Sequence, residues 1–136
     1  MKKFGMMITG LLISGACIAE SIVNVDRLIC ATNTVMLCVE DGVCFPVMAE
    51  DLGMPQFLVV DLKKKTLSTT EASGSARSSE LALVHRENGR VYLQGIEIGR
   101  AFTMVVEEDS GIMTGSVLRD GIAVAVFGAC TDAKVK

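Results

Sequence analysis

Four cysteines are the residues whose type and spacing predict chemistry most clearly. Cys30, Cys38, Cys44 and Cys130 form an even set in residues 20–136, and a small domain in an oxidising compartment normally pairs such a set as disulfides. Between Cys38 and Cys44 the sequence VEDGV fits a hairpin whose three-residue loop ends in a left-handed glycine. Such a loop places the two cysteines opposite each other, at a separation that a disulfide tolerates.

We therefore predict the bridges Cys38–Cys44 and Cys30–Cys130. The other two pairings of the four cysteines remain alternatives. A two-residue turn at Asp41-Gly42 would place the sulfurs of Cys38 and Cys44 on opposite faces of the hairpin. A zinc site or a thioredoxin-like redox pair would need a Cys-x-x-Cys motif, which the sequence lacks.

The other residues that could do chemistry give weaker signals. The sequence has one histidine, no tryptophan and none of the common nucleophile, phosphate-binding or metal-binding motifs. We expect His85 to pack against Tyr92 across a hairpin, although a small hydrolase could use it as an acid–base group. The acidic residues 107–109 could bind Ca²⁺, but a solvated turn is the simpler interpretation. We predict no catalytic residue, no cofactor and no metal ion.

A loop supplies the candidate binding residues. Residues 69–79 are dominated by Ser, Thr, Ala and Gly and have no hydrophobic pattern, and loops held on a rigid sheet commonly carry binding residues. We expect Ser73, Gly74 and Arg77 to form the binding site. Five singly spaced arginines are expected to pair with the surplus acids, and a binding groove lined by some of them is the alternative: Arg77, Arg86, Arg90, Arg100 and Arg119.

The first 19 residues have the pattern of an export signal. Lys2 and Lys3 precede an uncharged run at 4–19 that ends in the small residues Cys17 and Ala19, as signal peptidase requires. A membrane span needs roughly 20 apolar residues, and this run is shorter and interrupted by glycines. We predict removal of residues 1–19 and a single periplasmic or secreted β-domain at 20–136 with no membrane span. Lipid attachment through Cys17 is the alternative.

Composition limits the class of partner. The chain has 136 residues, of which 50% are hydrophobic, and a mean hydropathy of +0.46, so it can build a core. Removing Lys2 and Lys3 with the leader leaves 11 Lys and Arg against 16 Asp and Glu, a formal charge of −5. Because no excess of basic side chains remains to neutralise phosphates, we exclude nucleic acid as a partner.

Regular turns predict the elements that must position these residues. Turn glycines recur ten to twelve residues apart between residues 80 and 130, a spacing typical of an antiparallel sandwich or barrel. The Asn88-Gly89 turn pairs His85 with Tyr92 and Leu81 with Ile96. The Asp120-Gly121 turn repeats this device and opposes Val117 to Val124. Ile98 is an unfavourable residue for a positive φ, so we expect its loop to differ from the other two-residue turns.

The first half of the domain has fewer turn signals. We predict a hairpin of 56–61 and 66–70 around three lysines, and one helical turn within 47–54. Residues 25–31 and 35–39 are expected to be strands, although 28–39 could be a short helix. The fold prediction is an all-β antiparallel meander of about eight strands, a small barrel or sandwich closed by Cys30–Cys130.

Two resemblances add to these interpretations. The stretch YLQGIEIGRAF at 92–102 and the ending VFGACT at 126–131 resemble small exported proteobacterial proteins without an assigned activity, which implies an exported location. More weakly, the chain is similar to periplasmic inhibitors of c-type lysozyme. That resemblance implies a small β-barrel, a disulfide joining the two ends of the domain, and the loop ASGSAR at 72–77 entering the enzyme's cleft.

The functional prediction follows from these points. We expect a non-enzymatic, disulfide-stabilised binding or envelope-accessory protein, with a protein or small-molecule partner in the cell envelope. A lysozyme-inhibitor-like protein that acts through Ser73, Gly74 and Arg77 is one alternative, and its acidic domain would suit a basic partner. A small hydrolase that uses His85 is the other.

Overall fold

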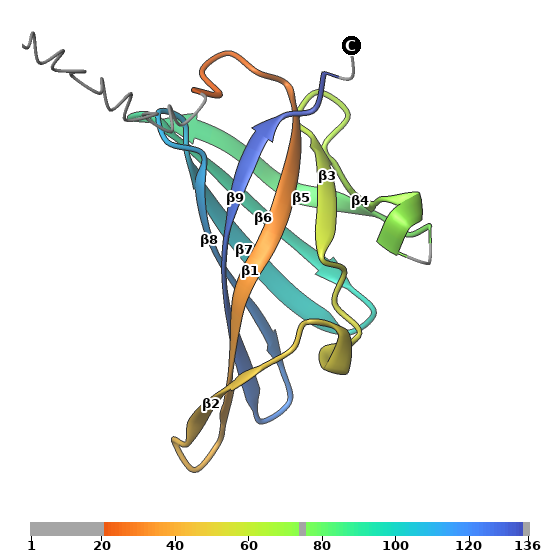
Figure 1. Cartoon of the computed structure of the whole chain (residues 1–136), viewed down its shortest axis with the longest axis vertical. Helices are drawn as coiled ribbons and strands as arrows, with labels where there is room; N and C mark the ends of the chain where they lie inside the picture. The colour runs from red at the N-terminus through yellow and green to blue at the C-terminus, as the bar shows by residue number, and fades with distance from the viewer. Residues whose placement is uncertain (1–20, 74–75, 135–136) are drawn as a thin grey trace, which may run out of the picture.

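The computed structural model describes residues 21–73 and 76–134, and its strands form one antiparallel sheet that closes on itself (Figure 1). The predicted leader, including Cys17, lies outside the described residues. Two 3₁₀ helices, η1 (Glu50–Leu52) and η2 (Glu71–Ser73), lie between strands. The strands are β1 (Arg27–Val39), β2 (Cys44–Val47), β3 (Phe57–Asp61), β4 (Thr66–Thr69), β5 (Ser78–Glu87), β6 (Arg90–Glu97), β7 (Arg100–Glu107), β8 (Ile112–Arg119) and β9 (Ile122–Asp132).

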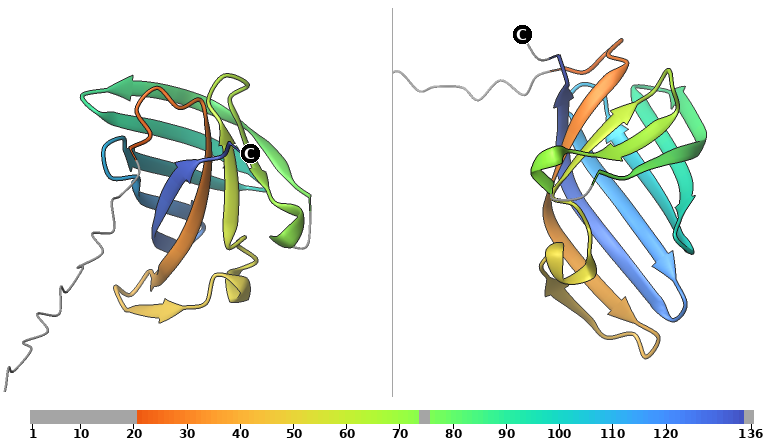
Figure 2. Two further views of the ribbon diagram at one scale, coloured as in Figure 1. Left: turned by 45° about the horizontal axis from the view of Figure 1, so that its top comes forward. Right: turned by 90° about the vertical axis from the view of Figure 1, so that its right-hand side faces the viewer.

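Strand β1 closes the barrel. It pairs with β9 along its whole length, from Leu28 opposite Asp132 to Val39 opposite Ile122, and the two strands lie side by side in every view (Figures 1 and 2). Its other edge pairs first with β3 and then with β2. The ring of β1 and β3 to β9 therefore has eight strands, and β2 extends the sheet outside it. The all-β prediction is confirmed as a closed barrel, which leaves no free edge in the ring.

The alternative of a short helix at 28–39 is wrong, because its apolar side chains alternate with the period of a strand. Leu28 and Cys30 point into the core, and a bulge at Asn33 shifts the alternation so that Val35 also points inward. The predicted helical turn within 47–54 is present as η1, and the predicted hairpin around three lysines is present as β3 and β4.

Both disulfides predicted from the sequence are present. Cys30–Cys130 joins β1 to β9 with its Cα atoms 3.9 Å apart, and Cys38–Cys44 joins β1 to β2 with its Cα atoms 4.1 Å apart. In the loop between Cys38 and Cys44, Gly42 has a φ of 85°, as the three-residue hairpin requires. The long-range bridge thus covalently joins the first and last strands of the ring.

The predicted registers hold near the turns. His85 lies opposite Tyr92, and Val117 lies opposite Val124. Further from the Asn88-Gly89 turn, Leu81 lies opposite Gly95 and not the predicted Ile96, because a bulge between Leu81 and Leu83 shifts the register. Bulges bend a strand, which a small closed barrel requires.

Two turn predictions need correction. Ile98 has a φ of 47° and Gly99 a φ of 71°, so this loop copies the Asn88-Gly89 turn despite its isoleucine. The eight-residue ladder between β6 and β7 continues to Glu97 opposite Arg100 and leaves two residues for the turn. At Asp120-Gly121 the register is as predicted, but only the glycine has a positive φ, so this turn is of a different type.

Alternate side chains of the strands fill the barrel. Gly95 makes room for one of them, since a Cβ there would lie 2.4 Å from the ring of Phe102. The buried apolar residues are Ile22, Leu28, Cys30, Val35, Val60, Leu62, Leu81, Val91, Leu93, Met104, Val106, Met113, Val124, Val126 and Cys130. The core therefore draws on both ends of the sequence as well as on the meander.

Residues 21–26 close one end of the barrel. Ile22 is fully buried, and its N–H donates to the carbonyl of Glu108 at 2.8 Å. The guanidinium of Arg86 donates to the carbonyl of Val25, and its Nε lies 3.2 Å from the carboxylate of Glu108. On the same end the ammonium of Lys63 hydrogen-bonds Asp26 at 2.9 Å and holds the pKa of that carboxyl below its usual value. The contribution of Asp26 to stability is therefore present at neutral pH and is lost as the pH falls.

Replacing Arg86 should open this end. We expect Arg86→Gln to lower the free energy of unfolding by about 1.5–3 kcal/mol, because it removes charge-assisted hydrogen bonds and leaves the mostly buried Glu108 carboxylate without its partner. Urea unfolding at pH 7 measures the difference. Arg90→Gln is the control, since Arg90 is exposed and has no ion pair within the described part of the chain. Equal losses in the two variants would contradict this role for Arg86.

Candidate binding site at the open end of the barrel

The opposite end of the barrel is open and leads into a cavity. The cavity has a volume of about 80 Å³ and reaches into the barrel from the side where η1 and the β6–β7 turn lie. Its apolar walls come from five strands and from the segment after η1: Met54, Leu58, Leu67, Phe102, Met104, Met113, Val117 and Val126. The interior is therefore a largely apolar, concave surface that can accept an apolar group.

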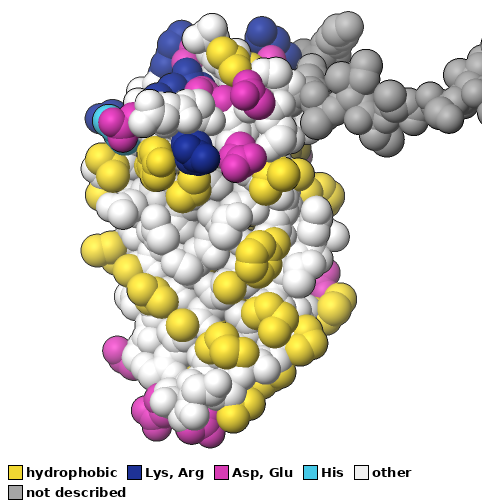
Figure 3. Space-filling model, turned by 90° about the vertical axis from the view of Figure 1, so that its left-hand side faces the viewer, with side chains coloured by type: hydrophobic (Ala, Val, Ile, Leu, Met, Phe, Trp, Pro, Cys, Tyr) yellow, Lys and Arg dark blue, Asp and Glu magenta, His cyan; other side chains and the backbone are white. Residues whose placement is uncertain are grey.

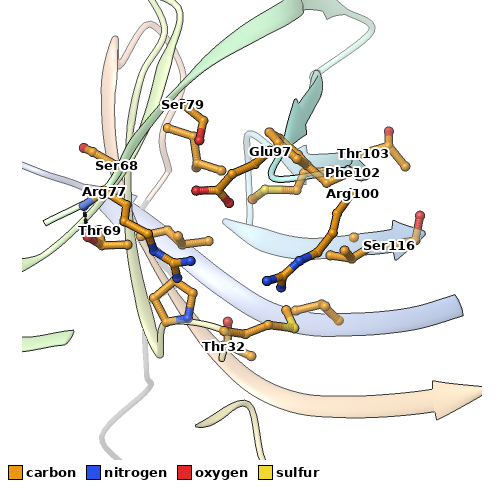
Figure 4. Close-up of a pocket in the computed structure, with 18 of the residues that line it drawn as sticks. Thr32, Ser68, Thr69, Arg77, Ser79, Glu97, Arg100, Phe102, Thr103 and Ser116 are labelled. Carbon is orange, nitrogen blue, oxygen red and sulfur yellow. Dashed lines mark hydrogen bonds between the residues drawn. The ribbon is translucent and has the colours of Figure 1, made fainter. Parts of the chain in front are cut away.

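Some residues reach the cavity only with their backbones. Thr103 and Ser116 border it, but their side chains point away from it (Figure 4). They alternate along their strands with Met104 and Val117, which face inward. Gly115 also borders the cavity, and a Cβ there would lie only 3.1 Å from the carbonyl of Thr103. Inward-facing side chains thus give the cavity walls their apolar character.

Arg77 places a positive charge in this cavity. It directly precedes β5, and its backbone N–H donates to the hydroxyl of Thr69 at 2.9 Å. Its Nη2 donates to the carbonyl of Gly53 at 3.1 Å, which connects the loop before β5 to the loop after η1. Its Nε is buried and has no hydrogen-bond partner among the described residues. The remaining N–H groups of the Arg77 guanidinium can donate to a ligand in the cavity.

Arg100 and Glu97 stand opposite each other at the β6–β7 turn and also line the cavity. The guanidinium groups of Arg77 and Arg100 point toward one another, and the carboxylate of Glu97 points toward the same space (Figure 4). Across residues 21–73 and 76–134, neither arginine has a carboxylate within 4.0 Å. Arg77, Arg100 and Glu97 together give the opening of the cavity, which we call the mouth, a formal charge of +1.

The outer wall beside the cavity carries no competing charge. The runs at 101–106, 112–118 and 122–131 in β7, β8 and β9 contain no Asp, Glu, Lys, Arg or His. Figure 3 shows apolar and uncharged side chains over the middle of one face of the molecule, with charged side chains near its ends. The charges of these three strands therefore lie at their two ends, and Arg100 is at the end where the cavity opens.

Of the two predicted binding residues that the structure describes, only Arg77 lines the cavity. The hydroxyl of Ser73 instead lies 3.0 Å from that of Thr70 and within 3.4 Å of the carbonyl of Phe57. Gly74 lies outside the described residues. The alternative of a groove lined by some arginines describes the site better, because Arg77 and Arg100 both line it.

Sequence reasoning missed Glu97 as a member of the site, and it named Arg100 only as one of five arginines that could line a binding groove. A signal existed, because Arg100 shares the inward parity of Phe102 and Met104 on the same strand. The sequence-based prediction instead paired Arg100, like the other singly spaced arginines, with the surplus acids.

The other candidate groups lie elsewhere. The ring of His85 lies 6.3 Å from that of Tyr92, with its Nε2 3.8 Å from the carboxylate of Glu87, on an exposed part of the sheet. Within the acidic run, Glu107 accepts a hydrogen bond from Ser110, and Glu108 pairs with Arg86. Across the described ranges, no three His, Cys, Asp or Glu side chains are grouped closely enough to hold a metal ion.

No match to a known protein emerges for this chain. No protein-family model, curated protein or solved structure matches it. The resemblances to small exported proteobacterial proteins and to lysozyme inhibitors therefore stay predictions. The functional proposal rests on the cavity, its apolar walls and the two arginines at its mouth.

Proposed function

We propose that this protein is an exported, non-enzymatic binding barrel that holds a small ligand of the cell envelope in the cavity at its open end. The observation that carries the proposal is a cavity with apolar walls that is lined by Arg77, which has no carboxylate partner among the described residues. Pockets that bind small molecules combine such walls with a few convergent polar groups. The rigid ring of strands would hold these groups in place before the ligand arrives, which lowers the entropic cost of binding.

Two observations support an exported location. Residues 1–19 have the pattern of a leader. The two disulfides belong to a class of bond that persists in oxidising compartments and is rare in the cytosol. Over the part of the chain that the structure describes, no helix has the length and apolar character needed to cross a membrane.

Methionine methyl groups provide the test. Met54, Met104 and Met113 line the cavity, whereas Met48 lines a separate groove outside the ring, between β2, η1 and the bulge of β1. We expect ¹³C-methyl spectra, recorded while adding a panel of small apolar and amphipathic compounds, to show saturable shifts of the three cavity methionines. Met48 should stay unchanged, because its methyl group does not face the cavity.

Filling the cavity gives the matched control. Val117→Phe adds a ring to the cavity wall, and Leu58→Phe does the same from β3 if the first variant folds poorly. We expect the folded variant to lose the shifts while keeping its melting temperature. The proposal would be wrong if no compound in the panel shifts the cavity methionines at millimolar concentration, or if the filled variant binds as well as the original protein.

A further inference from the structure

We propose that the cavity takes an aliphatic monocarboxylate, with its carboxylate between Arg77 and Arg100 and its tail inside the barrel. This inference rests on the proposed function and names the ligand class for the same site. It uses the charge of the mouth, the unused donors of the two arginines and the shape of the apolar walls.

The charge of the mouth fits one negative charge. Arg77 and Arg100 together carry two positive charges, and the nearby carboxylate of Glu97 offsets one of them (Figure 4). Neither arginine pairs with an acidic side chain anywhere in the described ranges. A monoanion would neutralise the remaining charge, whereas a cation would be repelled by the two guanidinium groups.

The donor geometry selects a planar anion. Each guanidinium carries five N–H donors in one plane, a shape that matches the two oxygens of a carboxylate. Arg77 spends one of its donors on the carbonyl of Gly53, and its buried Nε finds no acceptor among the described residues. A carboxylate held between the two arginines would accept hydrogen bonds from their other N–H groups. A neutral amide offers one acceptor oxygen, carries no charge and would leave donors unpaired.

The walls select a short tail. Below the arginines lie apolar side chains of Leu58, Phe102, Met104 and Met113. The cavity of about 80 Å³ is smaller than an engineered apolar cavity of about 150 Å³ that holds benzene. Each methylene that enters should raise the affinity about fourfold until the cavity is full, after which longer tails should add little.

Calorimetric titration of the purified, disulfide-bonded protein tests this inference. The probes are straight-chain carboxylates from acetate to octanoate, with hexanamide as the neutral counterpart of hexanoate. We expect hexanoate to bind at least tenfold more tightly than hexanamide, because the amide loses the charge-assisted hydrogen bonds. N-acetyl-Ala-Leu with a free carboxylate shows whether the same chemistry also accepts the end of a peptide. The tighter of the two acids identifies the natural source of the carboxylate.

Three substitutions separate charge from packing. Arg100→Gln should weaken hexanoate binding about tenfold or more and weaken hexanamide binding much less, because the amide makes no charge-assisted hydrogen bond. Glu97→Gln should strengthen hexanoate binding, because it removes the competing carboxylate from the mouth. Arg90→Gln at the far end of β6 should change neither.

The outcomes separate this inference from the function on which it rests. Equal affinities for hexanoate and hexanamide, with shifts of the cavity methionines for both, would overturn the carboxylate and leave the binding barrel standing. A weakening of hexanoate binding in Glu97→Gln would also contradict the carboxylate. The absence of any binding by the whole panel would overturn both.

Discussion

Replacing Cys30 and Cys130 together by alanine is expected to lower the free energy of unfolding by about 4–5 kcal/mol. The bridge spans 100 residues, and in the chain-entropy model a loop of that length restricts the unfolded chain by about this amount. Both cysteines are also almost fully buried at the junction of β1 and β9, so their loss removes packing where the ring closes. Urea unfolding of the double variant, compared with the oxidised protein, measures the change.

The second disulfide provides the matched control. Cys38 and Cys44 are separated by only 6 residues, and their removal is expected to cost about 2 kcal/mol in the same model. This bridge also lies outside the eight-stranded ring, at the β1–β2 hairpin. If the short-range double variant is destabilised as much as the long-range one, the chain-entropy argument for ring closure is wrong.

Gly128→Ala should lower the free energy of unfolding by about 3 kcal/mol or more. A Cβ at this position would lie 2.0 Å from the carbonyl oxygen of Ala31 and 2.7 Å from the methyl group of Met113. The carbonyl belongs to β1, whose backbone is fixed by its ladder with β9. The clash can therefore be relieved only by moving the two strands that close the barrel apart.

Comparison with Gly89→Ala shows how much of the destabilisation by Gly128→Ala comes from steric overlap. Gly89 has a φ of 72°, but a Cβ there would meet no heavy atom within 4 Å. We expect Gly89→Ala to lower the free energy of unfolding by about 1–2 kcal/mol, because its backbone is left-handed. Thermal and urea unfolding measure the loss of stability in each of the two variants. A smaller loss at Gly128 than at Gly89 would show that the junction of β1 and β9 is not tightly packed.

Local features of the fold were predictable from the sequence. The pairing of Cys38 with Cys44 follows from a loop of a few residues that ends in Gly42, so it needs no knowledge of the rest of the chain. The register of His85 with Tyr92 follows in the same way from the Asn88-Gly89 turn. Patterns over a few residues fix these contacts because a turn sets the register of its own strands.

Features set by closure of the ring were not predictable. The bulge after Leu81 places Gly95 opposite Leu81, where Ile96 was predicted. A bulge bends its strand, and this bend follows the curvature of the whole barrel. Ile98 adopts a positive φ because the β6–β7 ladder leaves no other connection. In both cases tertiary structure overrides the local preference.

The candidate site was predictable only in part for the same reason. Arg77 was found because it lies in a long polar loop, which is a local property. Arg100 and Glu97 reach the same cavity from a different hairpin, and only the closed ring brings them near Arg77. The separation of 20 residues between Glu97 and Arg77 carries no periodic pattern that would reveal this contact.

Intermolecular NOEs between bound hexanoate and the methionine methyl groups test most directly whether the open-ended cavity is the binding site. The terminal methyl of hexanoate should show NOEs to Met104 and Met113, which line the cavity. It should show none to Met48, which lines the outer groove. NOEs to Met48 alone would place the ligand in the groove outside the ring and contradict the cavity as the binding site.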